Sequence, residues 1–151
     1  MKINIKKLDA DAVLPTRGSS QAAGYDLYAK SSEDTVIPPH KTVMVGTGLA
    51  MEIPEGYFGA IFARSGLASK QGLRPANCVG VVDSDYRGEI MVILLNTNPA
   101  GKESYTIHPG DKIAQGEFPF PYKADFKEIS NEEFDKLTTS RGENGFGSSG
   151  K

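Results

Sequence analysis

The sequence predicts an all-β domain built as a sandwich or barrel. Short runs of β-branched residues recur along the chain, and Gly, Pro, Asn, Asp and Ser separate them at frequent intervals. Helical periodicity of useful length is absent. The 151 residues suit one domain with a core large enough to fold unaided. We therefore expect a single β domain over residues 1–140, followed by a glycine-rich arm over residues 141–151.

The composition excludes several classes of function. Lys and Arg total 17 against 19 Asp and Glu, so there is no basic excess to bind a nucleic-acid backbone. The single cysteine, Cys78, cannot form an internal disulfide, and with His40 and His108 it lacks any zinc-ligand spacing. No stretch resembles a signal sequence or a membrane span. We expect a cytoplasmic protein with no nucleic-acid or membrane partner.

The first half of the chain predicts several short strands. Residues 2–8 alternate polar and apolar side chains, which is typical of an edge strand. Residues 23–29 have strand composition but include Asp26, which is either a polar strand end or a group aimed at a metal or sugar. Residues 42–53 form a strand with bends at glycines. The Pro-Glu-Gly turn that follows predicts that residues 43–53 and 57–63 pair as a hairpin.

Residues 64–72 predict one or two turns of helix, with Ser65 as the N-cap and Gly72 as the C-cap. Arg64 precedes this helix. A cation beside free N–H groups suits a phosphate, although a capped connector would have the same sequence.

The stretch from Asn77 to Leu95 predicts a β-hairpin around a turn at residues 83–85. This turn carries two carboxylates, Asp83 and Asp85, next to Tyr86. Either the two Asp residues only form the turn, or one of them activates a water molecule beside backbone groups that read a flat base.

The last third predicts strands near residues 105–107, 113–115 and 123–129, and a helical turn over residues 131–137. The tail that follows cannot build a core, because glycine and serine flank a single aromatic residue, Phe146. The tail is either a frayed terminus or an arm that closes over a ligand, with Arg141 on phosphate and Phe146 on a base.

Taken in order, these features resemble one family, the trimeric deoxyuridine triphosphate nucleotidohydrolases (dUTPases). The family has five short motifs, and the resemblance runs from about residue 15 to the C-terminus. The matching stretches are AGYDLY (23–28), ARSGLA (63–68), NCVGVVDSDYRGE (77–89), GDKIAQ (110–115) and RGENGFGSSG (141–150). Departures from the family pattern are Ala63, Lys112, Asn144 and Ser149. Lys112 replaces an arginine and alters an expected ion pair inside the subunit.

The resemblance implies a distorted jelly-roll fold and a reaction of dUTP with water that gives dUMP and pyrophosphate. Asp83 would be the general base that directs water to the α-phosphorus. Mg²⁺ would bridge the triphosphate, with Asp26 holding the ion through water. Three subunits would share each active site, and the tail of one chain would cap another.

The resemblance also assigns residues to each part of the substrate. The phosphates would contact Arg64, Ser65, Gly66, Gln115 and Arg141. The base and sugar would contact Asn77, Val81, Val82, Tyr86 and Met91. Tyr86 would stack on the deoxyribose and exclude a ribose 2′-hydroxyl. The closing tail would contribute Phe146, Gly147 and Ser148.

The sequence also leaves three other functions open. A deoxycytidine triphosphate deaminase, or a bifunctional form, shares the fold but needs a glutamate at the base. The nearest glutamate, Glu89, is expected to be structural. A nucleotide-sensing module without catalysis and a plain β-sandwich interaction domain are further alternatives.

Overall fold

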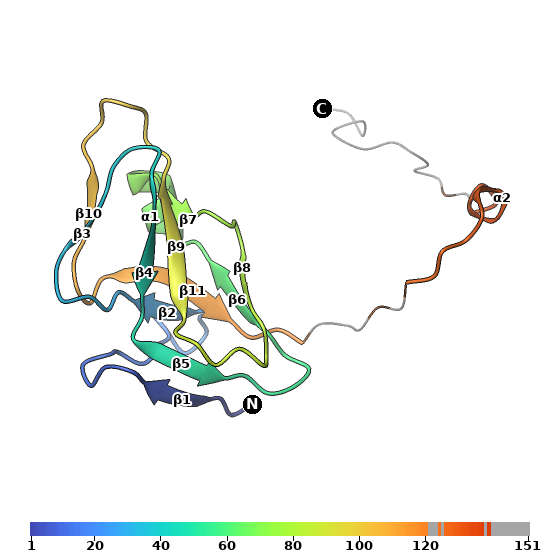
Figure 1. Ribbon diagram of the computed structural model, residues 1–151, viewed down its shortest axis with the longest axis horizontal. Helices are drawn as coiled ribbons and strands as arrows, with labels where there is room; N and C mark the ends of the chain where they lie inside the picture. The colour runs from blue at the N-terminus through green and yellow to red at the C-terminus, as the bar shows by residue number, and fades with distance from the viewer. Residues whose placement is uncertain (121–123, 125, 138, 140–151) are drawn as a thin grey trace. The chain divides into compact units, whose positions relative to one another are not determined.

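The computed structural model describes residues 1–120, 124, 126–137 and 139. Over these residues the secondary structure is mainly short strands, which confirms the all-β prediction (Figure 1). The strands are β1 (Asn4–Lys7), β2 (Tyr25–Tyr28), β3 (Thr35–Ile37), β4 (Thr42–Gly46), β5 (Leu49–Glu52), β6 (Gly59–Phe62), β7 (Leu73–Pro75), β8 (Gly80–Val82), β9 (Met91–Asn96), β10 (Tyr105–Ile107) and β11 (Lys112–Glu117). The helices are α1 (Ser65–Gln71) and α2 (Asn131–Phe134).

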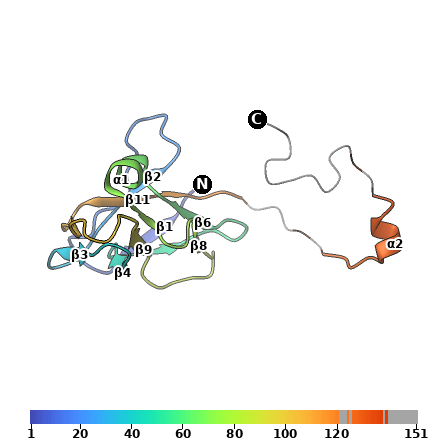
Figure 2. The same cartoon turned by 90° about the horizontal axis from the view of Figure 1, so that it is seen from above.

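The chain divides into two units, Met1–Pro121 and Tyr122–Lys151. In the first unit the strands form sheets ordered β2-β11-β6-β8 and β4-β9-β7, with the pairs β1-β5 and β10-β3 beside them. Seen from above, β4 lies on one side of the domain and β2 on the other (Figure 2). The buried core lies between the sheets and includes Leu27, Ile37, Val45, Leu49, Leu73, Val92, Leu94, Ile107 and Ile113.

Strand β9 shows how the sequence pattern produces this packing. Its burial alternates, so that Val92 and Leu94 face the core while Met91 and Ile93 face outward. Because both edges of β9 are paired, with β4 on one side and β7 on the other, this strand is central to its sheet.

Two predicted hairpins are wrong, and both errors have the same cause. The strands within residues 77–95 do not pair with each other, because β8 pairs with β6 and both edges of β9 are occupied. Likewise β5 does not pair with β6, because β11 and β8 occupy the two edges of β6. The turn after residue 53 is present, and Tyr57 N donates to Pro54 O at 3.1 Å.

The predicted helix near residue 65 is present, with one correction at its start. The N-cap is Arg64, which makes no side-chain capping bond, and Ser65 is the first helical residue rather than the cap. The predicted C-cap, Gly72, is confirmed. Its φ of 65° is a left-handed conformation that glycine adopts without strain.

The second unit contains the predicted helical turn near residue 131. A capping box at Ser130 and Glu133 begins α2, because each side chain bonds the other residue's backbone N–H. The strand predicted over residues 123–129 is wrong for its described members, 124 and 126–129, which form no strand. A strand needs a neighbour to pair with, and none is present there within the described residues. The described helices are too short to cross a membrane.

Asn96 is a buried polar residue that joins β9 to β3. Its Nδ2 donates to Ile37 O at 2.9 Å, and its Oδ1 accepts from Asn98 N at 3.0 Å. We predict that Asn96→Ala lowers the free energy of unfolding by about 1–3 kcal/mol, because it removes the bond to the buried carbonyl of Ile37 and the bond from the half-buried N–H of Asn98. Urea denaturation measures this. The matched control is Asn4→Ala, whose bond is exposed, and we expect a change within about 0.5 kcal/mol.

Candidate active site

A groove of about 400 Å³ lies between β8 and β9 and gathers one group of the predicted site residues. All six residues assigned to the base, the sugar and the attacking water line it, and they come from one stretch of the chain, residues 77–91. They are Asn77, Val81, Val82, Asp83, Tyr86 and Met91. The structure therefore brings this group together.

One edge of β8 is available to a ligand. The strand pairs with β6 on one side, and no described strand pairs with its other edge. A free strand edge presents alternating N–H donors and C=O acceptors. The side chain of Asn77 makes no hydrogen bond with the described residues, and it lies beside Gly80 at the start of this edge. The groove thus offers main-chain and amide groups suited to the edge of a flat base.

Asp83 follows β8 directly and is exposed to solvent. It lines the groove and also a larger polar depression of about 910 Å³ beside β1 and the turn at residues 54–57. Its carboxylate makes no hydrogen bond or ion pair with any described residue. Asp83 is therefore free to accept a bond from a water molecule at the mouth of the groove.

The corner that carries Asp83 is held by its own hydrogen bonds. Tyr86 N donates to Asp83 O at 3.1 Å, which closes a turn. Arg87 Nη1 donates to Ser84 O at 2.6 Å and to Tyr86 O at 3.0 Å. Tyr86 Oη donates to Glu89 O at 3.2 Å. These bonds hold the backbone of Asp83 and the ring of Tyr86, while the Asp83 carboxylate makes no bond to a described residue.

A second group of predicted residues lies around β2, β11 and the start of α1. Gln115 on β11 lies opposite Asp26 on β2 and opposite Phe62 on β6. Its Nε2 donates to Ala63 O at 3.2 Å. Arg64 Nε contacts Asp26 Oδ1 at 3.2 Å. The register of the sheet therefore places Asp26, Arg64 and Gln115 side by side.

Lys112 completes the charge pattern of this second group. Its Nζ lies 2.8 Å from Asp26 Oδ2, and its carbonyl accepts from Arg64 Nη1 at 3.0 Å. The hydrogen bond to Asp26, together with the attraction of its charge, raises the pKa of Lys112 above its ordinary value. The ion pair expected inside the subunit is therefore present with lysine in place of arginine. Arg64 has further N–H donors available for an anion.

Ser65 and Gly66 are both exposed at the start of α1, next to Arg64. A side chain at Gly66 would meet no atom within 4 Å. The fold of this chain alone therefore gives no steric reason for glycine at position 66. The predicted contacts from Arg141, Phe146, Gly147 and Ser148 lie outside the described residues.

The predicted magnesium contact at Asp26 can be tested against the donors present. The described residues hold no group of three or more His, Cys, Asp or Glu side chains placed to bind a metal. A carboxylate has about four lone-pair positions, and two cations contact Asp26, so it can still accept from a metal-bound water. This donor set fits an ion held mainly by water and phosphate, as Mg²⁺ often is.

The two groups are centred on different strands of one sheet: Asp26 lies on β2 and Gln115 on the inner strand β11, whereas the base group is built around β8. β2 and β8 are the outer strands of the order β2-β11-β6-β8, so three strand spacings, roughly 14 Å, separate them. No hydrogen bond or ion pair between described residues joins the groups. The domain is thus an all-β protein that carries a strand edge suited to a base and, separately, a cationic cluster suited to phosphate.

The chain belongs to the dUTPase family, since the family model described as dUTPase matches residues 10–150. It is 48% identical over 151 residues to the deoxyuridine 5'-triphosphate nucleotidohydrolase of Wolinella succinogenes, covering 100% of this chain and 95% of that protein. Among solved structures it is similar to the Staphylococcus bacteriophage 80alpha dUTPase determined with dUPNHPP (TM-score 0.87, 29% identity, 99% of each chain).

A second solved structure bears on the metal. A mutant dUTPase from phage phi11 of S. aureus has a TM-score of 0.77 and 27% identity, over 89% of this chain and 100% of that one. That structure is described as showing how a structural Mg(II) ion is coordinated. The family and its structural neighbours confirm the expected jelly-roll-like β fold.

The sequence missed two features of this site. The first is the pair of cations on Asp26, because the sequence indicates no partner for the ion pair of Lys112 and predicts Arg64 only on phosphate. The second is the bond from Gly48 N to Glu89 Oε1 at 2.8 Å, which crosses 41 positions of sequence. The glycines at positions 46 and 48 are the available signal in the sequence, which predicts only bends or bulges there. The structural role expected for Glu89 is confirmed.

The contrast between the two aspartates gives a prediction. Asp26→Asn removes a charge that holds Arg64 and Lys112, so we expect the melting temperature to fall by several degrees. The matched substitution Asp83→Asn removes no contact between described residues, and we expect a melting temperature within about 2 °C of the wild type. Differential scanning calorimetry of the three proteins measures both. Equal losses would contradict the assignment of Asp26 to the fold and Asp83 to the groove.

Proposed function

We propose that the protein hydrolyses dUTP to dUMP and pyrophosphate, with the groove between β8 and β9 binding deoxyuridine. The observation that carries this proposal is the free edge of β8 beside an unpaired carboxylate. Uracil presents an acceptor, a donor and an acceptor along its pairing edge, which matches the alternating groups of a strand edge and the amide of Asn77. Cytosine reverses two of these groups, because its N3 is an acceptor and its exocyclic amine is a donor, and an unpaired buried polar group costs about 1–3 kcal/mol.

Tyr86 and Met91 complete the nucleoside site. Both line the groove and are 47% and 40% exposed, so each can cover a ligand. Tyr86 stacks on the deoxyribose and leaves no room for a 2′-hydroxyl. The backbone of Val81 and Val82 packs against the position of thymine's methyl group. Phe146 covers the base when the tail closes and so excludes water.

Asp83 acts as the general base. Its carboxylate accepts a proton from a water molecule as the oxygen of that water attacks the α-phosphorus. The bond from the α-phosphorus to the bridging oxygen breaks, and pyrophosphate leaves with the electron pair. Arg64, Ser65 and Gln115 hold phosphate oxygens near the reacting centre, and Arg141 binds the γ-phosphate.

Mg²⁺ is the proposed cofactor. The ion, when bound to the triphosphate, neutralises charge that develops on the leaving pyrophosphate. Asp26 holds it through water, which suits a carboxylate already shared by two cations. The structural Mg(II) ion described for the phage phi11 protein supports a role for this metal in the family.

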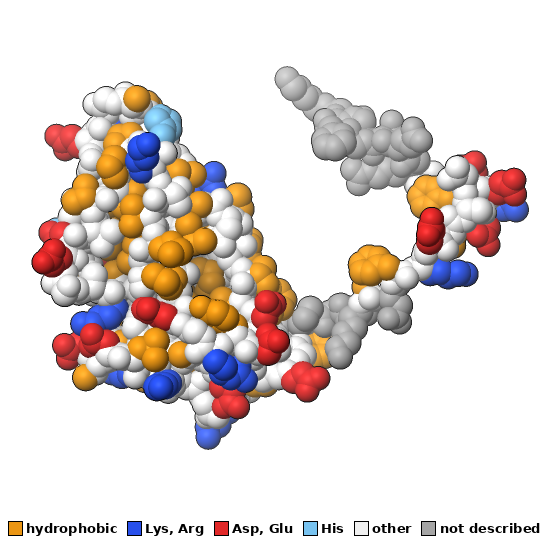
Figure 3. Space-filling model, viewed as in Figure 1, with side chains coloured by type: hydrophobic (Ala, Val, Ile, Leu, Met, Phe, Trp, Pro, Cys, Tyr) orange, Lys and Arg blue, Asp and Glu red, His pale blue; other side chains and the backbone are white. Residues whose placement is uncertain are grey.

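We further propose a homotrimer in which subunits share each site. On one chain, Asp26 on β2 and the base-binding residues on β8 lie on the two outer strands of one sheet, roughly 14 Å apart, so a neighbouring subunit supplies one group of residues to the other. Hydrophobic side chains gather on the face over β4 and β9 (Figure 3), where Met44 is 60% exposed and Met91 40% exposed. In the second unit, Phe126 and Phe134 are 98% and 66% exposed. A cytoplasmic location stays a prediction from the sequence.

A trimer makes a direct prediction about mass. We expect light scattering to give about three times the 16.2 kDa of one chain. Met44→Glu places a charge on the apolar face and should lower this mass, whereas Ser32→Glu, in an exposed loop, should not. A monomeric wild-type protein that is fully active would contradict the shared site.

The reaction is tested by a panel of nucleotides with magnesium. We expect pyrophosphate from dUTP and at least tenfold less from dTTP, dCTP and UTP. A deaminase on the same fold is the second candidate, and it would release ammonia from dCTP. Ammonia without pyrophosphate would overturn the proposal. Removal of magnesium with a chelator should abolish most of the dUTP turnover.

The same assay applied to Asp83→Asn separates catalysis from binding. We expect kcat to fall roughly 100- to 10,000-fold, because the amide cannot accept the proton. Binding of dUPNHPP should persist, since the groove is unchanged. A mutant that still turns over dUTP at the wild-type rate would contradict the role of Asp83, and a wild-type protein that only binds the nucleotide would indicate a sensing module.

A further inference from the structure

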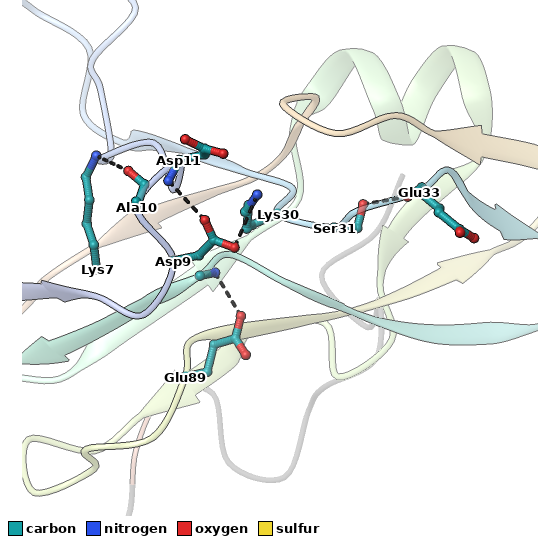
Figure 4. A network of polar contacts seen from close by, with 9 residues as sticks. Lys7, Asp9, Ala10, Asp11, Lys30, Ser31, Glu33 and Glu89 are labelled. Carbon is teal, nitrogen blue, oxygen red and sulfur yellow. Dashed lines mark hydrogen bonds and ion pairs between the residues drawn. The ribbon is translucent and has the colours of Figure 1, made fainter.

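Glu89 and Ile90, which end the segment that begins at Asp83, are hydrogen-bonded to the bend between β4 and β5. Glu89 Oε1 accepts a hydrogen bond from Gly48 N at 2.8 Å (Figure 4). Ile90 N donates to Leu49 O at 2.8 Å, and Ile90 O accepts from Thr47 N at 3.2 Å and from Thr47 Oγ1 at 2.7 Å. Residues 89 and 90 therefore have a fixed place relative to this bend.

The bend is a rigid frame. Gly48 has a φ of 67°, and a Cβ there would lie 2.9 Å from side-chain carbons of Ala12 and Lys30. At Gly46 a Cβ would lie 2.4 Å from Glu89 Oε1, so only glycine leaves room for the carboxylate. Gly46 thus leaves room for the Glu89 carboxylate, and Gly48 allows the bend that donates the hydrogen bond to it.

Glu89 also holds Tyr86. The carbonyl oxygen of Glu89 accepts the hydrogen bond from Tyr86 Oη at 3.2 Å. A Cβ at Gly88 would lie 2.3 Å from the same hydroxyl oxygen, so the ring packs directly over that glycine. One residue therefore connects the rigid bend, through its side chain, with the aromatic ring in the groove, through its backbone.

We propose that Glu89 is a positioning residue that fixes the Tyr86 ring and thereby sets the preference for deoxyribose over ribose. This inference rests on the proposed function. Exclusion of a single hydroxyl requires a ring that does not move aside, and small displacements at a binding site change rates strongly. A carboxylate suits the task, because a hydrogen bond from N–H to an ionised acceptor is about twice as strong as a neutral one.

The test is the ratio of kcat/KM for dUTP to that for UTP. We expect Glu89→Ala to lower this ratio roughly tenfold, mainly through KM. The turn that carries Asp83 should stay in place, because the bonds from Tyr86 N to Asp83 O and from Arg87 Nη1 to Ser84 O use no atom of the Glu89 side chain. Glu89→Gln should restore most of the ratio, since its amide oxygen still accepts from Gly48 N. The matched control is Asp34→Ala, which removes a carboxylate contact with His108 Nδ1 at 2.7 Å; neither residue lines the groove, so this variant should keep the wild-type ratio.

Three results would overturn this inference. One is a Glu89→Ala ratio equal to the wild type, and another is an equal loss in Asp34→Ala. The third is a wild-type protein that hydrolyses dUTP and UTP equally well. A wild-type protein that hydrolyses neither nucleotide overturns the proposed function and this inference with it, so the two failures are distinguishable.

A further variant decides the case in which Glu89→Ala does not fold. Tyr86→Phe keeps the ring and removes only the hydroxyl that bonds to Glu89 O. We expect it to lower the dUTP-to-UTP ratio as well. If Tyr86→Phe retains the wild-type ratio, the tether to Glu89 does not set the sugar preference, and the inference is wrong.

Discussion

Both edges of β9 are paired, and this constraint determines what the central stretch of the chain can do. β4 occupies one edge and β7 the other, so β8 cannot fold back onto β9 as a hairpin. It pairs with β6 instead and becomes the outer strand of a different sheet. The chain must then cross between sheets over residues 83–90. That crossing leaves one edge of β8 open beside the groove and places Asp83 at its mouth.

Local sequence patterns predicted most strands, and the order of the motifs predicted the family. Alternation identified β1, and Gly72 identified the end of α1, because these signals depend on neighbours in sequence. Strand pairing was predicted poorly, because it depends on which strand edges the distant strands of the sheet occupy. A Pro-Glu-Gly turn after residue 53 is compatible with a hairpin, but β11 and β8 occupy both edges of β6 in the folded domain.

In the candidate site, too, local features were predictable from the sequence and long-range contacts were not. The residues of the base and sugar group lie within residues 77–91, and their gathering in one groove was predictable from the motif at residues 77–89 and the strand that follows it. Contacts between distant segments were not. Asp26 meets Arg64 and Lys112 only through the register of β2 and β11, and Glu89 meets Gly48 only because the crossing passes the bend. These partners hold the carboxylates of Asp26 and Glu89, whereas the carboxylate of Asp83 contacts no described residue.

The open edge of β8 is tested most directly by amide hydrogen exchange with and without dUPNHPP. The outward N–H groups of β8 should exchange fast in the free protein and become protected when the nucleotide binds, whereas β9 amides, paired on both sides, should be protected in both states. Protection of every β8 amide without nucleotide, or fast exchange unchanged by its binding, would contradict the account.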